Sequence, residues 1–302
     1  MTVRKLNLKS KKMSKGNNIH IVDLVGEHVQ IGMFSDLHWD NPKTRLDILK
    51  RDLEYCKKNN IPMFFNGDTF CLMQGRGDRR GNKSDIRPEH NNAFYFDSIV
   101  NTAVDFFLPY ADHIIGFGQG NHETGIIKHQ ETDILQRFVD LLNAKANTKI
   151  EVGGYGGWIV VRQYLENSNS TKTWKIKYFH GSGGGGIVTK GAINLTRALE
   201  LYEGFDVFTM GHIHENSART DVRDTVVNHS QKGYYVEHKY IHMMLTGTYK
   251  EEYGNGSKGW HVERGAPPKP IGGRILQFTV KRVQKDNVRA IESHIDSIKF
   301  PL

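Results

Sequence analysis

Five short polar clusters, each directly after an apolar run, constrain this chain more than any other feature. The clusters are Asp36-Leu37-His38, Gly67-Asp68, Gly120-Asn121-His122-Glu123, the single His180 and Gly211-His212-Ile213-His214. Short apolar runs of this kind predict buried strands. Ligands of α/β proteins collect where strands end and loops begin, so side chains from several strand ends can share one pocket. The sequence therefore predicts a pocket that combines carboxylates, an amide and several imidazoles.

The first half of the chain alternates between strand-like and helix-like patterns. Buried strands are expected at 29–35, 61–65 and 114–117, and helices at about 94–108 and 132–142. A further helix is expected after the first strand, with Asn41 as its cap and Pro42 in its first turn. This alternation predicts helices that cover a sheet.

Strands dominate the second half of the chain. They are expected at 158–161, 174–179, 205–209, 240–245 and 275–280, with one helix at about 195–202 and a surface loop at 254–273. We expect a basic, flexible arm over residues 1–18 and one domain over residues 19–302. From about residue 220 to 302 this domain is expected to carry a strand-rich C-terminal elaboration.

The basic excess of the chain is concentrated at its start. Lys and Arg number 41 against 33 Asp and Glu, which gives a net charge of +8 and a pI of about 9.3. Six of these basic residues lie within the first 15 positions, where no acidic residue occurs. The rest of the chain is nearly neutral, so the pI supports a nucleic-acid partner only weakly.

Composition disfavours several classes of protein. No run reaches the roughly 18 to 20 apolar residues of a membrane helix, and the basic start lacks the apolar stretch of a secretory signal. We therefore expect a cytoplasmic protein without a membrane partner. Cys56 and Cys71 are too few for a disulfide framework and lack metal-ligand spacing, so both are expected to be buried free thiols.

The ordered set of polar clusters resembles the calcineurin-like metallophosphoesterases. The pattern of that family is D-x-H, G-D, G-N-H-[DE], a lone His and G-H-x-H, and all five blocks occur here in that order between Asp36 and His214. Each block alone is a weak signal, whereas the ordered set at strand ends is specific. The resemblance implies an α/β fold in the form of a four-layer αββα sandwich, with two mixed β-sheets flanked by helices.

The resemblance also implies a role for each matching residue. It assigns one metal ion to Asp36, His38 and His214, the other to Asn121, His180 and His212, and the bridge between them to Asp68. Imidazole and carboxylate ligands suit two divalent transition-metal ions such as Mn, Fe, Zn or Ni. In the family, a hydroxide shared by the two ions attacks phosphorus. The histidine at the position of His122 protonates the leaving oxygen as a general acid.

Two neighbours of these clusters have a structural interpretation. Glu123 opens an expected helix, where the helix dipole favours an acidic side chain, and we interpret it as structural. The glycine-rich run at 181–186 lacks the ending of a nucleotide-binding loop. We expect it to let the backbone pass close to His180.

The sequence leaves the class of phosphate ester open. Gln119 stands where the protein phosphatases of the superfamily have an arginine, which disfavours that branch. The loop after Asp68 carries Arg76, Arg79 and Arg80, which either bind substrate phosphate or form a solvated surface. The preferred prediction is a phosphodiesterase or nuclease acting on DNA, RNA or a nucleotide. The alternatives are a phosphomonoesterase, including a protein phosphatase, and an inactive module that binds metal or nucleic acid.

Overall fold

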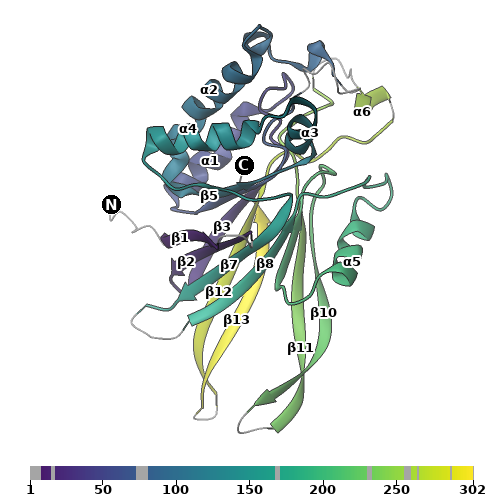
Figure 1. The fold of residues 1–302 in the computed structure, drawn as a ribbon. Helices are drawn as coiled ribbons and strands as arrows, with labels where there is room; N and C mark the ends of the chain where they lie inside the picture. The colour runs from purple at the N-terminus through teal and green to yellow at the C-terminus, as the bar shows by residue number, and fades with distance from the viewer. Residues whose placement is uncertain are drawn as a thin grey trace.

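The computed structural model describes residues 8–14, 18–72, 81–166, 171–229, 233–254, 260–263, 265–285 and 288–301. Its strands are β1 (Leu8–Ser14), β2 (Ile19–Val25), β3 (His28–Phe34), β4 (Met63–Asn66), β5 (Ile114–Gly118), β6 (Glu151–Val152), β7 (Gly156–Tyr164), β8 (Thr171–Phe179), β9 (Val207–Met210), β10 (Asn216–His229), β11 (Gly233–Thr246), β12 (Arg274–Lys285) and β13 (Val288–Lys299). Its α-helices are α1 (Leu46–Lys58), α2 (Tyr95–Phe107), α3 (Asn121–Gln130), α4 (Ile134–Ala146), α5 (Ala192–Leu201) and α6 (Trp260–Glu263). Short 3₁₀ helices lie at Lys83–Asp85, Pro88–His90 and Leu108–His113. Figure 1 shows how these elements stack.

One sheet contains six strands in the order β13-β12-β3-β4-β5-β6. The strands from β3 to β6 run parallel, because helices return the chain between them, whereas β12 pairs antiparallel with β3. Helices α1, α2 and α4 lie over one face of this sheet (Figure 1). Leu53 of α1, Val104 of α2 and Phe138 of α4 share a buried cluster with Phe65 of β4. The alternation in the sequence therefore corresponds to a helix-covered parallel region.

The other sheet contains seven strands in the order β1-β2-β7-β8-β9-β11-β10. Val22 and Ile176 on its inner face pack with Phe64 and Phe278 of the six-stranded sheet. On its outer face, Leu195 of α5 belongs to a separate buried cluster with Met243 and Phe208. Helices, sheet, sheet and helix are the four layers, so the predicted αββα sandwich of two mixed sheets is confirmed.

Helix α1 begins at Leu46, later than the sequence predicts. Oδ1 of Asn41 accepts a hydrogen bond from the backbone nitrogen of Lys43 at 2.9 Å and closes a turn. Thr44 then forms an isolated antiparallel bridge with Lys250, which keeps the chain extended. The predicted cap at Asn41 is therefore wrong, because asparagine side chains stabilise turns as readily as helix starts.

Residues Leu8–Ser14 differ from the flexible arm that we expected over residues 1–18. They form β1, which pairs antiparallel with β2 and is an edge strand of the seven-stranded sheet. The Lys11 ammonium donates a hydrogen bond to the carbonyl of Ile114, and burial lowers its pKa to about 8. The edge of β2 offers backbone donors and acceptors, so a polar segment pairs there without an apolar pattern of its own.

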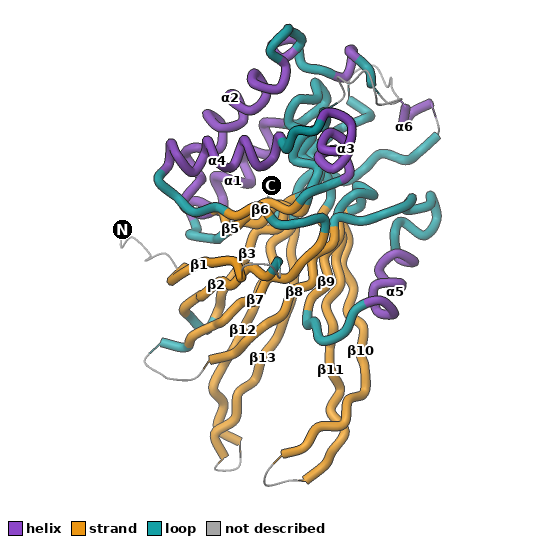
Figure 2. The backbone as a smooth tube through the Cα atoms, viewed as in Figure 1, coloured by secondary structure: helices purple, strands orange, loops and turns teal. Residues whose placement is uncertain are grey.

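The C-terminal strands belong to both sheets. β11 lies between β9 and β10, and β12 lies between β3 and β13, so this region completes the sandwich rather than adding to it. The hairpins β10–β11 and β12–β13 extend beyond the other strands and diverge at their far ends (Figure 2). Within the described residues, the structure contains no helix with the length and apolar character that crossing a membrane requires.

Candidate metal centre

The predicted site residues meet at the ends of strands from both sheets. Asp36 and His38 follow β3, Asp68 follows β4, Asn121 and His122 begin α3 after β5, His180 follows β8, and His212 and His214 follow β9. Because β3, β4 and β5 are parallel, their carboxyl ends lie at the same edge of the six-stranded sheet. β8 and β9 also pair in parallel, so their carboxyl ends lie at the same edge of the seven-stranded sheet.

Backbone strain is concentrated at this edge. Five predicted ligands have left-handed backbones: Asp36 (φ 53°), His38 (φ 50°), Asp68 (φ 50°), His212 (φ 67°) and His214 (φ 57°). Such conformations cost about 1–3 kcal/mol each and persist where the surrounding structure over-determines them. The packing of the two sheets therefore holds these side chains in orientations that isolated loops would not favour.

Asp36, His38 and His214 form a first group of possible metal ligands. Nε2 of His38 lies 3.2 Å from Nε2 of His214, which in turn lies 3.2 Å from Oδ1 of Asp36. Oδ2 of Asp36 accepts hydrogen bonds from Oγ of Ser35 at 2.6 Å and from the backbone nitrogen of His212 at 2.9 Å. One oxygen of the carboxylate is thus anchored, while the other faces the imidazoles.

Asp68, His180 and His212 form a second group, and Asn121 lies against it. Nε2 of His180 is 3.2 Å from Oδ2 of Asp68. Oδ1 of Asn121 is 3.2 Å from Nε2 of His180 and 2.8 Å from Nδ1 of His212. Nδ1 of His180 donates to the carbonyl of Asn66 at 2.8 Å, which fixes the ring and directs Nε2 at the carboxylate.

Burial and charge act in opposite directions within the second group. Burial raises the pKa of Asp68, but the nearby His180 and His122 outweigh it and hold this pKa well below its usual value. Burial lowers the pKa of His180, yet the Asp68 carboxylate beside it raises this pKa to about 10. A proton on His180 therefore balances Asp68 in the metal-free protein, and a divalent cation would supply that balance instead.

The donor set fits divalent transition-metal ions. Oδ1 of Asp36 is buried and has no hydrogen-bond partner among the described residues. Burial, together with His122 and His214, holds the pKa of His38 well below its usual value, and burial also lowers the pKa of His212. Neutral imidazole is the form that binds metals. The two groups thus provide candidate metal ligands, while the assignment of each residue to a particular ion stays a prediction.

Glycines in the polar clusters allow the strand ends to approach one another. A Cβ atom at Gly120 would lie 2.1 Å from Oδ1 of Asp68, and one at Gly211 would lie 2.5 Å from Oδ2 of Asp36. Cβ atoms in real structures essentially never come within 3.0 Å of such neighbours. A larger residue at either position would displace the carboxylate that the centre needs.

Glu123 has a structural role beyond the helix-dipole effect that the sequence indicates. Its Oε2 accepts hydrogen bonds from the backbone nitrogens of Asp68 at 3.1 Å and Gly120 at 2.8 Å, and its Oε1 accepts one from Phe70 at 3.0 Å. Burial and the Asp68 charge raise the pKa of Glu123 to about 8. This side chain joins the loop of Asp68 to the start of α3. Its spacing of three residues from Gly120 is the signal for such a capping contact.

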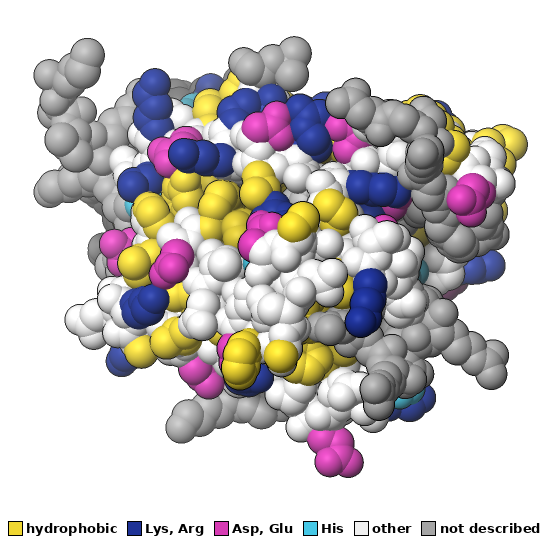
Figure 3. All heavy atoms as spheres, turned by 90° about the horizontal axis from the view of Figure 1, so that it is seen from above, with side chains coloured by type: hydrophobic (Ala, Val, Ile, Leu, Met, Phe, Trp, Pro, Cys, Tyr) yellow, Lys and Arg dark blue, Asp and Glu magenta, His cyan; other side chains and the backbone are white. Residues whose placement is uncertain are grey.

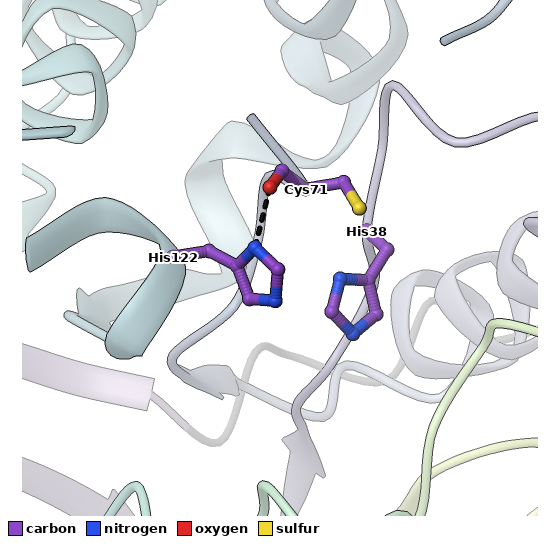
Figure 4. A group of neighbouring side chains, drawn as sticks. All are labelled: His38, Cys71 and His122. Atoms are coloured by element: carbon purple, nitrogen blue, oxygen red, sulfur yellow. Dashed lines mark hydrogen bonds between the residues drawn. The ribbon is translucent and has the colours of Figure 1, made fainter. Parts of the chain in front are cut away.

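His122 lies beside both ligand groups. Its Nδ1 donates a hydrogen bond to the backbone carbonyl of Cys71, and its Nε2 lies 3.8 Å from Oδ2 of Asp68. The centroid of its ring is 5.0 Å from that of His38. Cys71 is a buried free thiol, as predicted, and it lies beside these two rings, a position that was not predicted from the sequence (Figure 4). Its position three residues after Asp68 is the signal that was available.

The glycine-rich run is close to the site at one end. A Cβ atom at Gly181 would lie 2.7 Å from Cβ of His212, so the expected close passage of the backbone beside His180 is confirmed there. The hydroxyl of Tyr155 donates to the carbonyl of Gly181 at 2.7 Å and fixes this end. Cβ atoms at Gly183 and Gly184 would meet no atom within 4 Å, whereas one at Gly185 would lie 3.5 Å from Cβ of Ile213.

The basic loop after Asp68 is described in part. Arg76, Arg79 and Arg80 lie outside the described residues, so their contact with substrate stays a prediction. Arg87, at the end of the same loop, is buried with its guanidinium 4.9 Å from the ring centroid of Trp39, which indicates a packing role. Figure 3 shows Lys and Arg mixed with Asp and Glu over the face seen from above. The charge on this face is therefore of both signs.

Comparison with known proteins gives limited information. No family model and no curated protein matches the sequence. Among solved structures, Vps29 of Chaetomium thermophilum is 10% identical with a TM-score of 0.32, and the match covers 90% of this chain and 100% of Vps29. GAP50, described as the anchor in the inner membrane complex of Plasmodium, is 11% identical with a TM-score of 0.38, and the match covers 88% of each chain. Likenesses this distant carry no argument about fold or activity, so the αββα assignment rests on the sheets themselves.

Proposed function

We propose that this protein is a two-metal phosphoesterase. The observation that carries the proposal is the placement of two ligand groups side by side, Asp36–His38–His214 and Asp68–His180–His212, with His122 next to both. When bound, two divalent cations would supply positive charge that neutralises phosphate oxygens and lowers the pKa of water. The edge of the sandwich where these strand ends meet, here called the polar edge, is then a hydrolytic site.

The residues of the chain have distinct parts in this proposal. Asp36, His38 and His214 would hold one ion, Asn121, His180 and His212 would hold the other, and Asp68 would be a ligand shared by both. His122 protonates the leaving oxygen from Nε2, because its Nδ1 is engaged by the carbonyl of Cys71. Glu123 keeps Asp68 in place through three backbone hydrogen bonds.

Within this class we favour a phosphodiester substrate in DNA, RNA or a nucleotide, with manganese among the suitable ions. The reasons are the absence of the protein-phosphatase arginine at Gln119 and the arginines of the loop at 76–80. A phosphomonoesterase is the alternative within the enzymes. Single-stranded and duplex DNA, RNA, cyclic nucleotides and a matched chromogenic diester and monoester, each assayed with Mn, Ni, Zn and Mg, separate these substrates.

Chelation and Asp68→Ala test the metal centre. We expect both to abolish hydrolysis, and Asp68→Ala to weaken metal binding by more than about 100-fold, the upper end for loss of a residue that merely supports a ligand. Asp105→Ala is the control, because Asp105 is exposed and pairs with Lys145 on the helical face. Activity that survives both treatments would contradict the proposal. Tight binding of two metals without hydrolysis of any substrate would favour the inactive binding module.

A further inference from the structure

We propose that Cys71, His38 and His122 form a third cation site, selective for thiophilic ions such as Zn²⁺ or Cd²⁺. The site adjoins the first oxygen-containing ligand group and shares His38 with it, with Nε2 of His38 facing that group and Nδ1 left for the third site. An ion bound there would engage the ring of His122. The expected inhibition of hydrolysis by this ion rests on the proposed function, whereas the existence of the third cation site does not.

The geometry brings one donor atom from each residue into a small space. A sulfur atom of Cys71 and one ring nitrogen each of His38 and His122 all lie within 4.8 Å of one another. In Figure 4 the sulfur and the two rings surround a common space. Cys71 is 1% exposed and His38 is 3% exposed, so these donors are shielded from competing water. A modest contraction would bring all three to bonding distance from one ion.

The hydrogen bonds determine which nitrogens are directed at this space. Nδ1 of His122 donates to the carbonyl of Cys71, so Nε2 is the ring nitrogen that carries a lone pair when the ring is neutral. Nε2 of His38 faces His214 in the first ligand group. Nδ1 of His38 is buried with no hydrogen-bond partner among the described residues. A third cation would satisfy this buried nitrogen.

Asp40 positions the cysteine over the centre. Its carboxylate accepts hydrogen bonds from the backbone nitrogens of Cys71 at 2.6 Å and Leu72 at 3.0 Å, and from the hydroxyl of Tyr95. Leu72 has a left-handed backbone with φ of 56°. The buried Asp40 carboxylate therefore fixes the conformation of the turn at Cys71 and Leu72. The amide of Asn41 also donates to the sulfur, at 3.5 Å.

The donor chemistry separates this site from its neighbours. One sulfur and two imidazoles favour Zn²⁺ and Cd²⁺, whereas carboxylate and amide oxygens accept Mn²⁺ and Mg²⁺. On binding, the thiol proton of Cys71 and the Nδ1 proton of His38 are released to solvent, a metal–thiolate bond forms, and His38 bridges the third ion and the ion of the first ligand group as an imidazolate. The ion would hold Nε2 of His122, the nitrogen that the proposed function needs for protonation of the leaving group. Excess Zn²⁺ should therefore inhibit an enzyme that Mn²⁺ activates.

Cobalt spectroscopy tests the site, because Co²⁺ bound to a thiolate gives a charge-transfer band in the near ultraviolet. The chain has 2 cysteines, so Cys56→Ala is a matched control for Cys71→Ala; Cys56 is buried in the helical core. We expect the band in the metal-depleted wild type titrated with Co²⁺ and in Cys56→Ala. We expect Cys71→Ala to lack the band and to bind one ion fewer. Circular dichroism verifies that each variant is folded.

Two results would overturn the proposal: no charge-transfer band at saturating Co²⁺, or a band that persists in Cys71→Ala. In active protein, excess Zn²⁺ should reduce turnover of the Mn²⁺ form by about 100-fold, the lower end of a general-acid contribution. Cys71→Ala should lose most of that inhibition. A band without hydrolysis of any substrate would retain the third site and reject the proposed function. Hydrolysis without a band would reject the third site and retain the proposed function.

Discussion

The polar edge of the sandwich and the tips of its long hairpins differ in nearly every physical property, although strand β11 extends into both. Near the tip, Tyr234 is 79% exposed and Val236 is 59% exposed, whereas the last six residues of the same strand are buried. At the polar edge, Asp36 and His180 are fully buried. The hairpin strands pair in unbroken register, while the edge concentrates left-handed backbones. Strain and burial thus collect where charged groups must be held close together.

This contrast indicates how the fold is organised. Buried charges are costly unless their partners are fixed, so the edge needs close packing and a complete set of hydrogen bonds. The hairpin tips carry exposed valines and tyrosines that contact little of the core. Substitutions at the edge should therefore have large effects, and matched substitutions at the tips should have small ones.

Among substitutions that leave the two ligand groups intact, the largest effect is expected from His122→Ala. Loss of a general acid should reduce hydrolysis by about 100- to 10,000-fold on substrates with poor leaving groups, and far less on substrates whose leaving group needs no proton. Metal occupancy of the two ligand groups, measured with Mn²⁺, should stay at the wild-type value. Steady-state rates over a series of aryl phosphodiesters of graded leaving-group pKa measure the difference. Equal losses across the series would contradict the role of His122.

A smaller but still large effect is expected from Gly120→Ala. The added Cβ would lie 2.1 Å from Oδ1 of Asp68, so that carboxylate must move. We expect metal affinity to fall by about 10- to 100-fold, as when the support of a ligand is lost. Gly184→Ala is the control, because a Cβ there meets no atom within 4 Å. The metal affinities of the two variants, measured by calorimetric titration, should differ clearly. Equal affinities would show that the loop of Asp68 shifts to accommodate the added Cβ without loss of metal binding.

An intermediate effect is expected in the core between the two ends. His20 is buried against Phe64 and Tyr178, and burial lowers its pKa from 6.5 to about 4. The unfolded chain then binds more protons than the folded one between these values. The neutral, buried His20 contributes about 3 kcal/mol to the free energy of unfolding. This contribution is fully present above pH 6.5 and is lost as pH falls towards 4.

Denaturant unfolding at several pH values measures this dependence. His20→Leu should flatten the fall in unfolding free energy between pH 6.5 and 4 relative to wild type. His28→Gln, at an exposed position on β3, should keep the wild-type slope. An unchanged slope in His20→Leu would mean that other groups, such as the buried His242, cause the acid sensitivity.

The smallest effects are expected at the hairpin tips. Tyr234→Ser and Val226→Thr replace side chains that are 79% and 68% exposed, so unfolding free energy should change by less than about 0.5 kcal/mol. Hydrolysis should stay at the wild-type rate. A loss well above that value, together with a change in mass by light scattering, would reveal that the tips are buried in an assembly.

Much of the fold follows from apolar patterning. The helix expected at 94–108 is α2 at Tyr95–Phe107, and the strand expected at 114–117 is β5 at Ile114–Gly118. The strands β10 and β13 were missed from the sequence. Among their described side chains, Val222, Val226 and Ile291 are exposed, so no buried apolar face marks these parts of the strands. β1 was missed because pairing at an edge does not require an apolar face.

The sequence by itself determined which residues form the polar edge, because each cluster follows a strand whose apolar pattern is strong. It also determined that glycines accompany Asp68, Asn121 and His212. Only the tertiary structure decided that the Glu123 carboxylate accepts hydrogen bonds from the loop of Asp68 and that Cys71 lies beside His38 and His122. The physical reason is that these contacts depend on left-handed turns and backbone hydrogen bonds between distant loops. Such features are set by the packing of the two sheets and leave no periodic signal in the chain.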